Sequence, residues 1–330
     1  HLLKTAGITG FLRLRRPNSS FHIVRPYALT VVTYVILSCI SLLTVFLNLL
    51  VIISISHFKQ LHSPTNLLVL SLAVSDFFVG PLMLCQIMLI DGCWFLGNFA
   101  CSLISCIDYI ITTTSIGIMV LISIDRYVAI CDPLHYSTKV TQKRVQVCVL
   151  LCWILSALCH SLLLKDNLAH PGRYNTCTGE CVIVIEYVAG RVDMFVSFIG
   201  PVTVIIVLYM RVFVVAVSQA RAMRSHIKAF TVQGSVRLKA KKSEVKAART
   251  LGVVIIVFLI CLCPYFCVTL TSQDTLLSAS STTVVICLFY LNSCLNPLIY
   301  ALFYPWFQKS VKLIVSLKIL QPGSCQANIV

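Results

Sequence analysis

Seven apolar runs, each long enough to cross a bilayer, constrain this chain more than any other feature. They lie near 29–56, 67–90, 99–131, 145–164, 187–217, 250–272 and 282–303. Because about 20 apolar helical residues span a hydrocarbon core, each run predicts one transmembrane helix. None of the runs alternates apolar and polar residues, so a barrel is excluded and an all-α seven-helix bundle is predicted. The predicted membrane domain, 29–303, follows an N-terminal segment, 1–28, and precedes a tail, 304–330.

The positive charge of the chain follows these spans and so indicates membrane orientation rather than nucleic-acid binding. The formal net charge is +15, and basic residues gather in 211–249, between the fifth and sixth spans, and in 139–144. Because basic loops stay cytoplasmic, both segments and the tail are predicted inside and the N-terminus outside. Five basic residues within 1–25 favour the opposite orientation, but the larger cluster decides. Asn18 opens a glycosylation sequon on the predicted outer side.

Two further segments are predicted to meet the membrane. The first span is long enough to act as its own membrane signal, so no cleaved leader is expected. After the last span, an amphipathic stretch from Tyr304 carries Lys309, Lys312 and Lys318. This pattern predicts a short helix that lies on the inner leaflet.

The third span carries ionisable residues at both of its ends. Asp108 lies about two turns after Cys101, and the cluster Asp125-Arg126-Tyr127 lies near the other end. At about 1.5 Å per helical residue, the two aspartates are roughly 25 Å apart, close to the thickness of a hydrocarbon core. A buried acid near the outer leaflet indicates a counter-ion for a cationic ligand, and a structural hydrogen bond is the alternative.

A second acid, Asp193, lies at a similar depth near the start of the fifth span. Ser197 follows one turn later on the same helical face. Asp193 either faces Asp108 across one cavity or turns outward to pair with Arg191 or Lys165. Three aromatic residues of the last two spans provide either faces for an organic cation or ordinary packing: Tyr265, Phe266 and Tyr290.

Asp76 lies within the second span, where an aspartate costs a few kcal/mol unless it has partners or water. It either hydrogen-bonds to Asn48 for packing or forms an ion site or a proton-linked switch. A dense polar cluster from Asn292 to Tyr300 lies deep in the seventh span.

Most of the seventeen cysteines lie inside the spans, where thiols act as small hydrophobes. Four lie in or at the predicted outer loops, where oxidation is expected: Cys93, Cys101, Cys177 and Cys181. Cys101 is the obvious partner for Cys177 or Cys181, but four cysteines allow three pairings and the sequence leaves them open.

Other classes of function find less support in the sequence. No nucleophile elbow, metal-ligand spacing or pair of catalytic carboxylates is present, so neither an enzyme nor a metal site is expected. Intramembrane acids also mark cation paths, which keeps an amine or cation transporter as the alternative, although no inverted repeat is evident. The seventh span has no lysine for a Schiff base, which argues against a retinal photoreceptor.

The ordered set of motifs resembles the rhodopsin-like G-protein-coupled receptors. The resemblance covers roughly 28–318 and rests on Asn48, Leu72-Ala73, Asp76, Cys101, Asp125-Arg126-Tyr127, Trp153, Pro201, Pro264 and Asn296-Pro297-Leu298-Ile299-Tyr300. The runs 292–307 and 54–66 are similar to trace amine-associated receptors, an amine-sensing olfactory branch.

This resemblance implies a role for each of the residues. Asp108 would bind the ligand ammonium and Asp193 the far amine of a diamine, within a ligand site of Asp108, Asp193, Ser197, Tyr109, Thr112, Tyr265, Phe266 and Tyr290. An allosteric sodium ion, with no other cofactor, is implied at Asp76, Ser115, Asn292, Ser293 and Asn296. The residues that rearrange for the G protein would be Arg126, Tyr209 and Tyr300, with Glu244 as the resting partner of Arg126. The family's disulfide would be Cys101–Cys181.

The implied function is a plasma-membrane receptor for amine odorants in olfactory sensory cilia. Diamines or polyamines are the expected ligands, and a stimulatory G protein that raises cAMP is the expected partner. A monoamine receptor of the same family is the alternative. Three positions depart from the family pattern: Leu262 replaces a usual tryptophan, Leu47 a glycine and Cys287 a tryptophan. An impaired receptor is therefore a further alternative.

Overall fold

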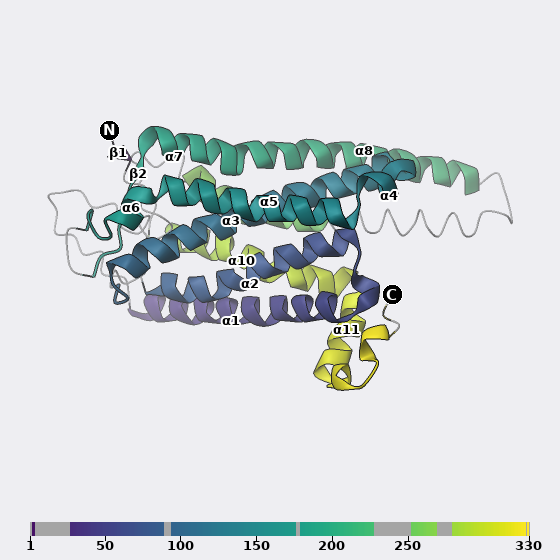
Figure 1. Ribbon diagram of the computed structural model, residues 1–330, viewed down its shortest axis with the longest axis horizontal. Helices are drawn as coiled ribbons and strands as arrows, with labels where there is room; N and C mark the ends of the chain where they lie inside the picture. Colours follow the sequence, from purple (N-terminus) through teal and green to yellow (C-terminus); the bar gives the residue numbers. More distant parts are fainter. Residues whose placement is uncertain are drawn as a thin grey trace.

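The long helices run side by side along one axis and form a single elongated bundle (Figure 1). The computed structural model describes residues 2–3, 27–88, 94–175, 179–227, 252–268, 279–327 and 329. The long elements are α1 (Tyr27–His57), α2 (Pro64–Ile87), α3 (Asn98–Cys131), α5 (Gln142–Leu163), α7 (Tyr187–Met194), the π-helix η4 (Phe195–Ile199), α8 (Gly200–Ile227) and α10 (Ala279–Phe303). A shorter apolar helix, Gly252–Val268, lies between α8 and α10 in sequence.

These helices match the seven predicted spans and confirm the all-α bundle. Six helices among the described residues are long and apolar enough to cross a membrane, with α7, η4 and α8 forming one continuous span. Glu244 and Asn18 lie outside the described residues, as do Cys93 and Cys177. The outer surfaces of α1, α5 and α8 expose leucine, isoleucine, valine and phenylalanine, as expected of helices that face lipid.

The bundle is tightest where α1 crosses α2. A Cβ atom on Gly80 would lie 2.5 Å from Cγ2 of Val45, so only glycine fits at this crossing. The hydroxyl of Ser41 donates a 2.8 Å hydrogen bond to the Gly80 carbonyl across the same contact. Small and hydroxyl-bearing residues thus allow the close helix approach that membrane bundles favour. On its other sides α2 packs against α3, which also contacts α5 and α8.

The two ends of the bundle differ. We call them the disulfide end, which holds the Cys101–Cys181 bond, and the α11 end, which holds α11 (Pro305–Val315). At the disulfide end lie α6 (Lys165–Ala169) and a small antiparallel sheet, in which β1 (Leu2–Leu3) pairs with β2 (Ile185–Glu186). Cys101 is bonded to Cys181 at this end, with their Cα atoms 5.6 Å apart. This bond confirms the predicted disulfide.

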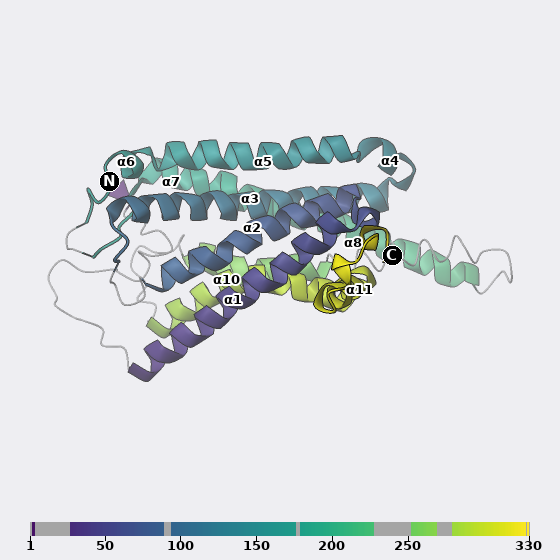
Figure 2. The same cartoon turned by 60° about the horizontal axis from the view of Figure 1, so that its bottom comes forward.

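At the α11 end, short helices cap the bundle. They are η2 (Lys59–Leu61), η3 (Pro133–His135), α4 (Tyr136–Lys139), α11 (Pro305–Val315), η5 (Lys318–Leu320) and η6 (Ser324–Gln326). Figure 2 shows α11 turning away from the direction of α10. Phe307 and Ser310 of α11 are buried while Lys309 and Lys312 are exposed, which confirms the predicted amphipathic helix after the last span.

Candidate functional site

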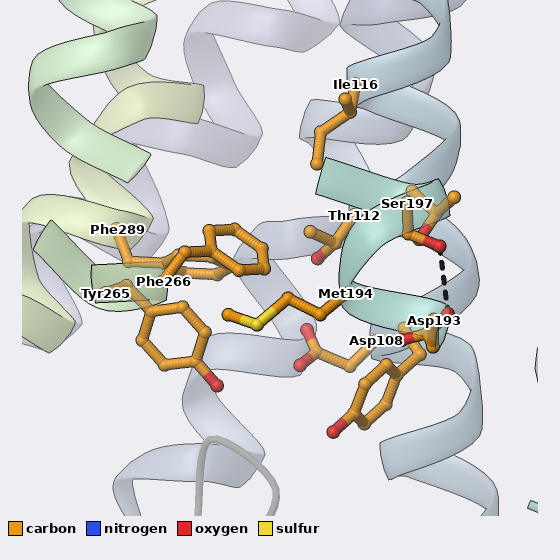
Figure 3. Close-up of a pocket in the computed structure, with 11 residues that line it drawn as sticks. Asp108, Thr112, Ile116, Asp193, Met194, Ser197, Tyr265, Phe266 and Phe289 are labelled. Carbon is orange, nitrogen blue, oxygen red and sulfur yellow. Dashed lines mark hydrogen bonds between the residues drawn. The ribbon is translucent and has the colours of Figure 1, made fainter. Parts of the chain in front are cut away.

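A small pocket of about 50 Å³ lies between α3, the α7–η4 segment, the helix Gly252–Val268 and α10 (Figure 3). We call it the central pocket. Its lining consists of Asp108, Tyr109, Thr112, Thr113, Ile116, Asp193, Met194, Ser197, Tyr265, Phe266 and Phe289. The two acids predicted to share a cavity therefore both line this one.

Helix geometry explains which side chains reach the pocket. The five lining residues of α3 are spaced at i, i+1, i+4, i+5 and i+8 from Asp108, which is one face of an α-helix. On the fifth span, Pro201 cannot donate a backbone hydrogen bond and crowds the preceding turn. The five residues Phe195–Ile199 form a π-helix just before it, a distortion often found at functional sites. Asp193, Met194 and Ser197 face the pocket around this distortion.

Asp108 is a buried acid that has no polar partner among the described residues. Its exposed fraction is 4%. Within the described part of the chain, no hydrogen bond or ion pair reaches its carboxylate. A buried charge is costly unless it is paired, and this carboxylate lines the pocket without such a pairing among these residues. The alternative of a structural hydrogen bond finds no counterpart among these residues.

Asp193 has partners, and they come from inside the bundle. Ser197 donates a 2.9 Å hydrogen bond to its Oδ1, as the shared helical face predicted (Figure 3). Nε2 of the buried His160, on α5, lies 3.3 Å from the same oxygen. The guanidinium of Arg191 instead lies over the ring of Tyr187. Asp193 therefore faces the pocket and does not pair outward with Arg191.

The wall opposite the acids is aromatic. Phe266 stacks on Phe198 of η4 with their ring centroids 3.6 Å apart, and Tyr265 lies edge-on to Phe266 and close to Phe289. In Figure 3 the side chain of Met194 extends toward this wall, beside Asp108. Such ring faces attract cations electrostatically, so the pocket combines two acids with an aromatic surface.

Tyr290 does not line the central pocket, although it was predicted to contact the ligand. Its side chain is buried and its hydroxyl has no hydrogen-bond partner among the described residues. Phe289 lies in the pocket instead. The reason is rotational phase, because consecutive residues of a helix point about 100° apart.

A second polar cluster lies between α2, α3 and α10. Nδ2 of Asn296 donates a 2.8 Å hydrogen bond to Oδ2 of Asp76, and Ser115 donates to Ser75 at 2.8 Å. Four buried oxygens have no hydrogen-bond partner in the described part of the chain: Oδ1 of Asn48, Asp76, Asn292 and Asn296. Asn48 donates to the Ser293 carbonyl rather than to Asp76. The cluster holds the five predicted sodium-pocket residues, all of them buried.

Comparison with known proteins assigns the family. Residues 47–300 match the model of the 7 transmembrane receptor (rhodopsin family). The chain is 36% identical to trace amine-associated receptor 4 of Mus musculus over 315 residues, which cover 92% of this chain and 91% of the relative. The chain belongs to the trace amine-associated receptors. It is also 38% identical to receptor 6 of Homo sapiens (91% and 89% covered) and 37% identical to receptor 13c of Danio rerio (90% and 89% covered).

Membership of this family makes the protein a multi-pass plasma-membrane receptor and not an enzyme. Its partners are a small-molecule ligand and a G protein. The receptor family also removes the transporter alternative that the intramembrane acids had left open.

At the α11 end of the receptor, Arg126 and its neighbour Asp125 form a polar cluster with residues of α2 and α4. Its guanidinium forms an ion pair with Asp125 and donates to Thr65 at 2.8 Å. Tyr136 of α4 donates to Oδ1 of Asp125 at 2.8 Å. Burial raises the pKa of the Tyr136 phenol, which keeps this donor protonated. Glu244, the predicted partner of Arg126, lies outside the described residues.

The other two predicted switch residues lie near this cluster. Tyr209 of α8 packs against Gly252, where an added Cβ would lie 3.0 Å from the tyrosine ring. Tyr300 of α10 is buried, with its ring centroid 6.0 Å from that of Tyr304. Tyr209 therefore lies at a contact with the sixth helix, which a movement of that helix would change.

Sequence reasoning missed several residues that the structure brings to these sites. His160 contacts Asp193, while Thr65 and Tyr136 contact the Asp125–Arg126 pair. For His160 a signal was present, because an ionisable residue in an apolar span is costly and usually has a function. Thr65 and Tyr136 carried no comparable signal, since they lie at the ends of helices where polar residues are common.

Proposed function

We propose that this receptor detects diamines or polyamines, with one ammonium at Asp108 and another at Asp193. The observation that carries the proposal is the pair of acids in one pocket, one of which, Asp108, has no partner among the residues that the structure describes. Two carboxylates in a low-dielectric site repel each other and are poorly solvated, and a dication between them relieves both costs. A ligand with one ammonium would leave Asp193 to its protein partners.

The further steps of signalling belong to the same proposal. The disulfide end faces the outside of an olfactory sensory cell, and the α11 end engages a stimulatory G protein that raises cAMP. Exposed Arg144, Arg211, Lys309 and Lys312 near the α11 end support this orientation, because basic residues favour the cytoplasmic side. Amine binding favours the active arrangement only if the ligand binds that arrangement more tightly than the inactive one. Contacts with the aromatic wall on the sixth helix can supply this difference in affinity.

Asp193→Asn is expected to reduce the potency of 1,5-diaminopentane by roughly 10- to 100-fold. A lost hydrogen bond between charged partners is worth about 1.5–3 kcal/mol. The length-matched monoamine 1-aminohexane should change by less than about threefold, because its single ammonium is held at Asp108. The measurement is amine-evoked cAMP in transfected cells at equal surface expression. A variant that keeps the diamine response but loses the monoamine response would refute the two-acid model.

We also propose that Asp76, Ser115, Asn292, Ser293 and Asn296 hold a sodium ion. Among the described residues, Oδ1 of Asp76, Asn292 and Asn296 is buried without a hydrogen-bond partner, and such oxygens fit an alkali cation. A bound sodium ion would supply positive charge to the Asp76 carboxylate and join α2, α3 and α10. The residues themselves orient the carboxylate, through the hydrogen bond from Asn296.

Replacing N-methylglucamine chloride by sodium chloride should raise the melting temperature of the purified receptor by about 2 °C or more, because a ligand of the folded state stabilises it. Asp76→Asn should remove this difference while retaining a cooperative transition. Potassium chloride at the same concentration controls for ionic strength. An equal rise with sodium in wild type and variant would exclude Asp76 as the site.

A further inference from the structure

His160 lies at the end of α5 nearest the pocket, behind Asp193, and is almost completely buried, with 1% of its surface exposed. Its Nδ1 lies 2.9 Å from the carbonyl oxygen of Ser156, one helical turn earlier. Its Nε2 lies 3.3 Å from Oδ1 of Asp193 and 3.3 Å from the hydroxyl of Thr113. The ring of Tyr109 stacks on the imidazole at 5.7 Å between centroids. The imidazole therefore has one fixed orientation, with Nε2 directed at the acid.

These contacts restrict where the imidazole can carry its protons. A carbonyl oxygen can only accept a hydrogen bond, so Nδ1 carries a proton toward Ser156. A neutral ring then presents the bare lone pair of Nε2 to the carboxylate, and among the described residues the hydroxyl of Thr113 is the donor within reach of it. A protonated ring presents an N–H to Asp193 and pairs with it. The charge of His160 thus decides whether Asp193 is already paired.

We propose that His160 is the positioning residue that sets diamine selectivity, because its charged form and the second ammonium of the ligand compete for Asp193. The inference rests on the proposed function of Asp193. When the second ammonium binds, one proton leaves Nε2 of His160 for the solvent and the neutral ring accepts from Thr113. Binding of a diamine is therefore linked to proton release, and binding of a monoamine is not.

The other groups around the imidazole do not reproduce this linkage. Among the described residues, those in contact with it are Asp193 from the α7–η4 segment, Tyr109 and Thr113 from α3, and Ser156 from α5 itself. Asp108 lies in the same pocket but binds the ammonium that both kinds of ligand share. Histidine is the side chain that ordinarily changes charge between pH 5 and 8, whereas alkylamines stay charged there.

The test compares 1,5-diaminopentane with 1-aminohexane between external pH 5.5 and 8, with cAMP as the readout and forskolin to correct for effects on the cell. In the wild type, diamine potency should fall as the pH falls, approaching about tenfold per pH unit for one competing proton. The monoamine should change by less than about threefold. His160→Gln keeps a donor near the position of Nε2 without a titrating charge, so its diamine potency should be independent of pH. His160→Asn serves if the glutamine variant does not reach the cell surface.

His170→Gln is the matched control. His170 lies at the same end of the receptor, is exposed and pairs with Asp166 at 3.4 Å, away from the pocket. This variant should retain the pH dependence of the wild type. If diamine potency still falls with acid in a surface-expressed His160 variant, His160 is not the competing group, although the two-acid proposal survives. If the Asp193→Asn variant responds to diamines with the same potency as the wild type, the two-acid proposal itself fails.

Discussion

Asp108→Ala is expected to lower the potency of every amine by roughly 100-fold or more. Removing one member of a buried ion pair costs about 3–5 kcal/mol, because the other charge stays buried without a partner. No carboxylate replaces it on the same face of α3, where the lining residues after Asp108 are Tyr109, Thr112, Thr113 and Ile116. The measurement is a cAMP dose–response series for mono-, di- and polyamines, normalised to receptor at the cell surface.

Two variants make this result specific. Asp108→Asn keeps the shape of the side chain and removes only the charge, so a comparable loss assigns the effect to electrostatics. Asp166→Asn removes an exposed acid at the same end of the receptor, where a hydrogen bond from Tyr174 holds the pKa of the carboxyl below its usual range. Its potency should stay within about threefold of wild type, as expected for an exposed charge. Full amine potency in Asp108→Asn would show that Asp108 is not the counter-ion.

The spans and their acids could be predicted from sequence because the bilayer leaves few options. Backbone polar groups must be satisfied within lipid, so each long apolar run becomes a helix. Inside such runs an ionisable residue is expensive, which made Asp76, Asp108 and Asp193 visible without a structure. The shared face of Asp193 and Ser197 followed from the spacing of four residues, and the 2.9 Å hydrogen bond between them confirms it.

The details of the pocket could not be predicted, since they depend on how the helices rotate against each other. Phe289 rather than Tyr290 faces the pocket because of the phase of α10. Helix packing places α5, with His160, against Asp193. The spacing of residues along one span does not reveal which helix packs there. His160 could have been noticed as an ionisable residue, but its partner could not.

This chain has Leu262 where the family usually has a tryptophan. The substitution raises the question of how ligand binding in the pocket is communicated to the sixth helix. Leu262 is buried in the main core and is not a pocket residue. One turn away, Phe266 both lines the pocket and stacks on Phe198 of the π-helix. This stack joins the fifth and sixth spans directly. A ligand that contacts Phe266, as proposed above, would therefore be connected to the sixth helix without a tryptophan at 262.

The double substitution Cys101→Ser with Cys181→Ser is expected to remove most functional receptor from the cell surface. A native disulfide typically contributes about 2–5 kcal/mol, and this one closes a long loop because its cysteines are 80 residues apart. Beyond Cys181 the chain is held by reciprocal hydrogen bonds between Asn167 and the backbone of Val184, at 2.7 and 3.1 Å. The disulfide therefore anchors the segment that leads into α7 and thus into Asp193. Flow cytometry of intact cells, with total receptor from blots, gives the surface fraction.

Cys159→Ser is the matched control, because this free cysteine is exposed on α5 at the same end of the bundle. It should leave both surface fraction and amine potency unchanged. Receptor of the double variant that still reaches the surface should show a larger loss of diamine than of monoamine potency, since the anchored segment positions Asp193 but not Asp108. Equal surface levels and equal potencies in the double variant and the control would show that the bond is dispensable. In that case, the hydrogen bonds of Asn167 and the pairing of β2 would have to position α7 by themselves.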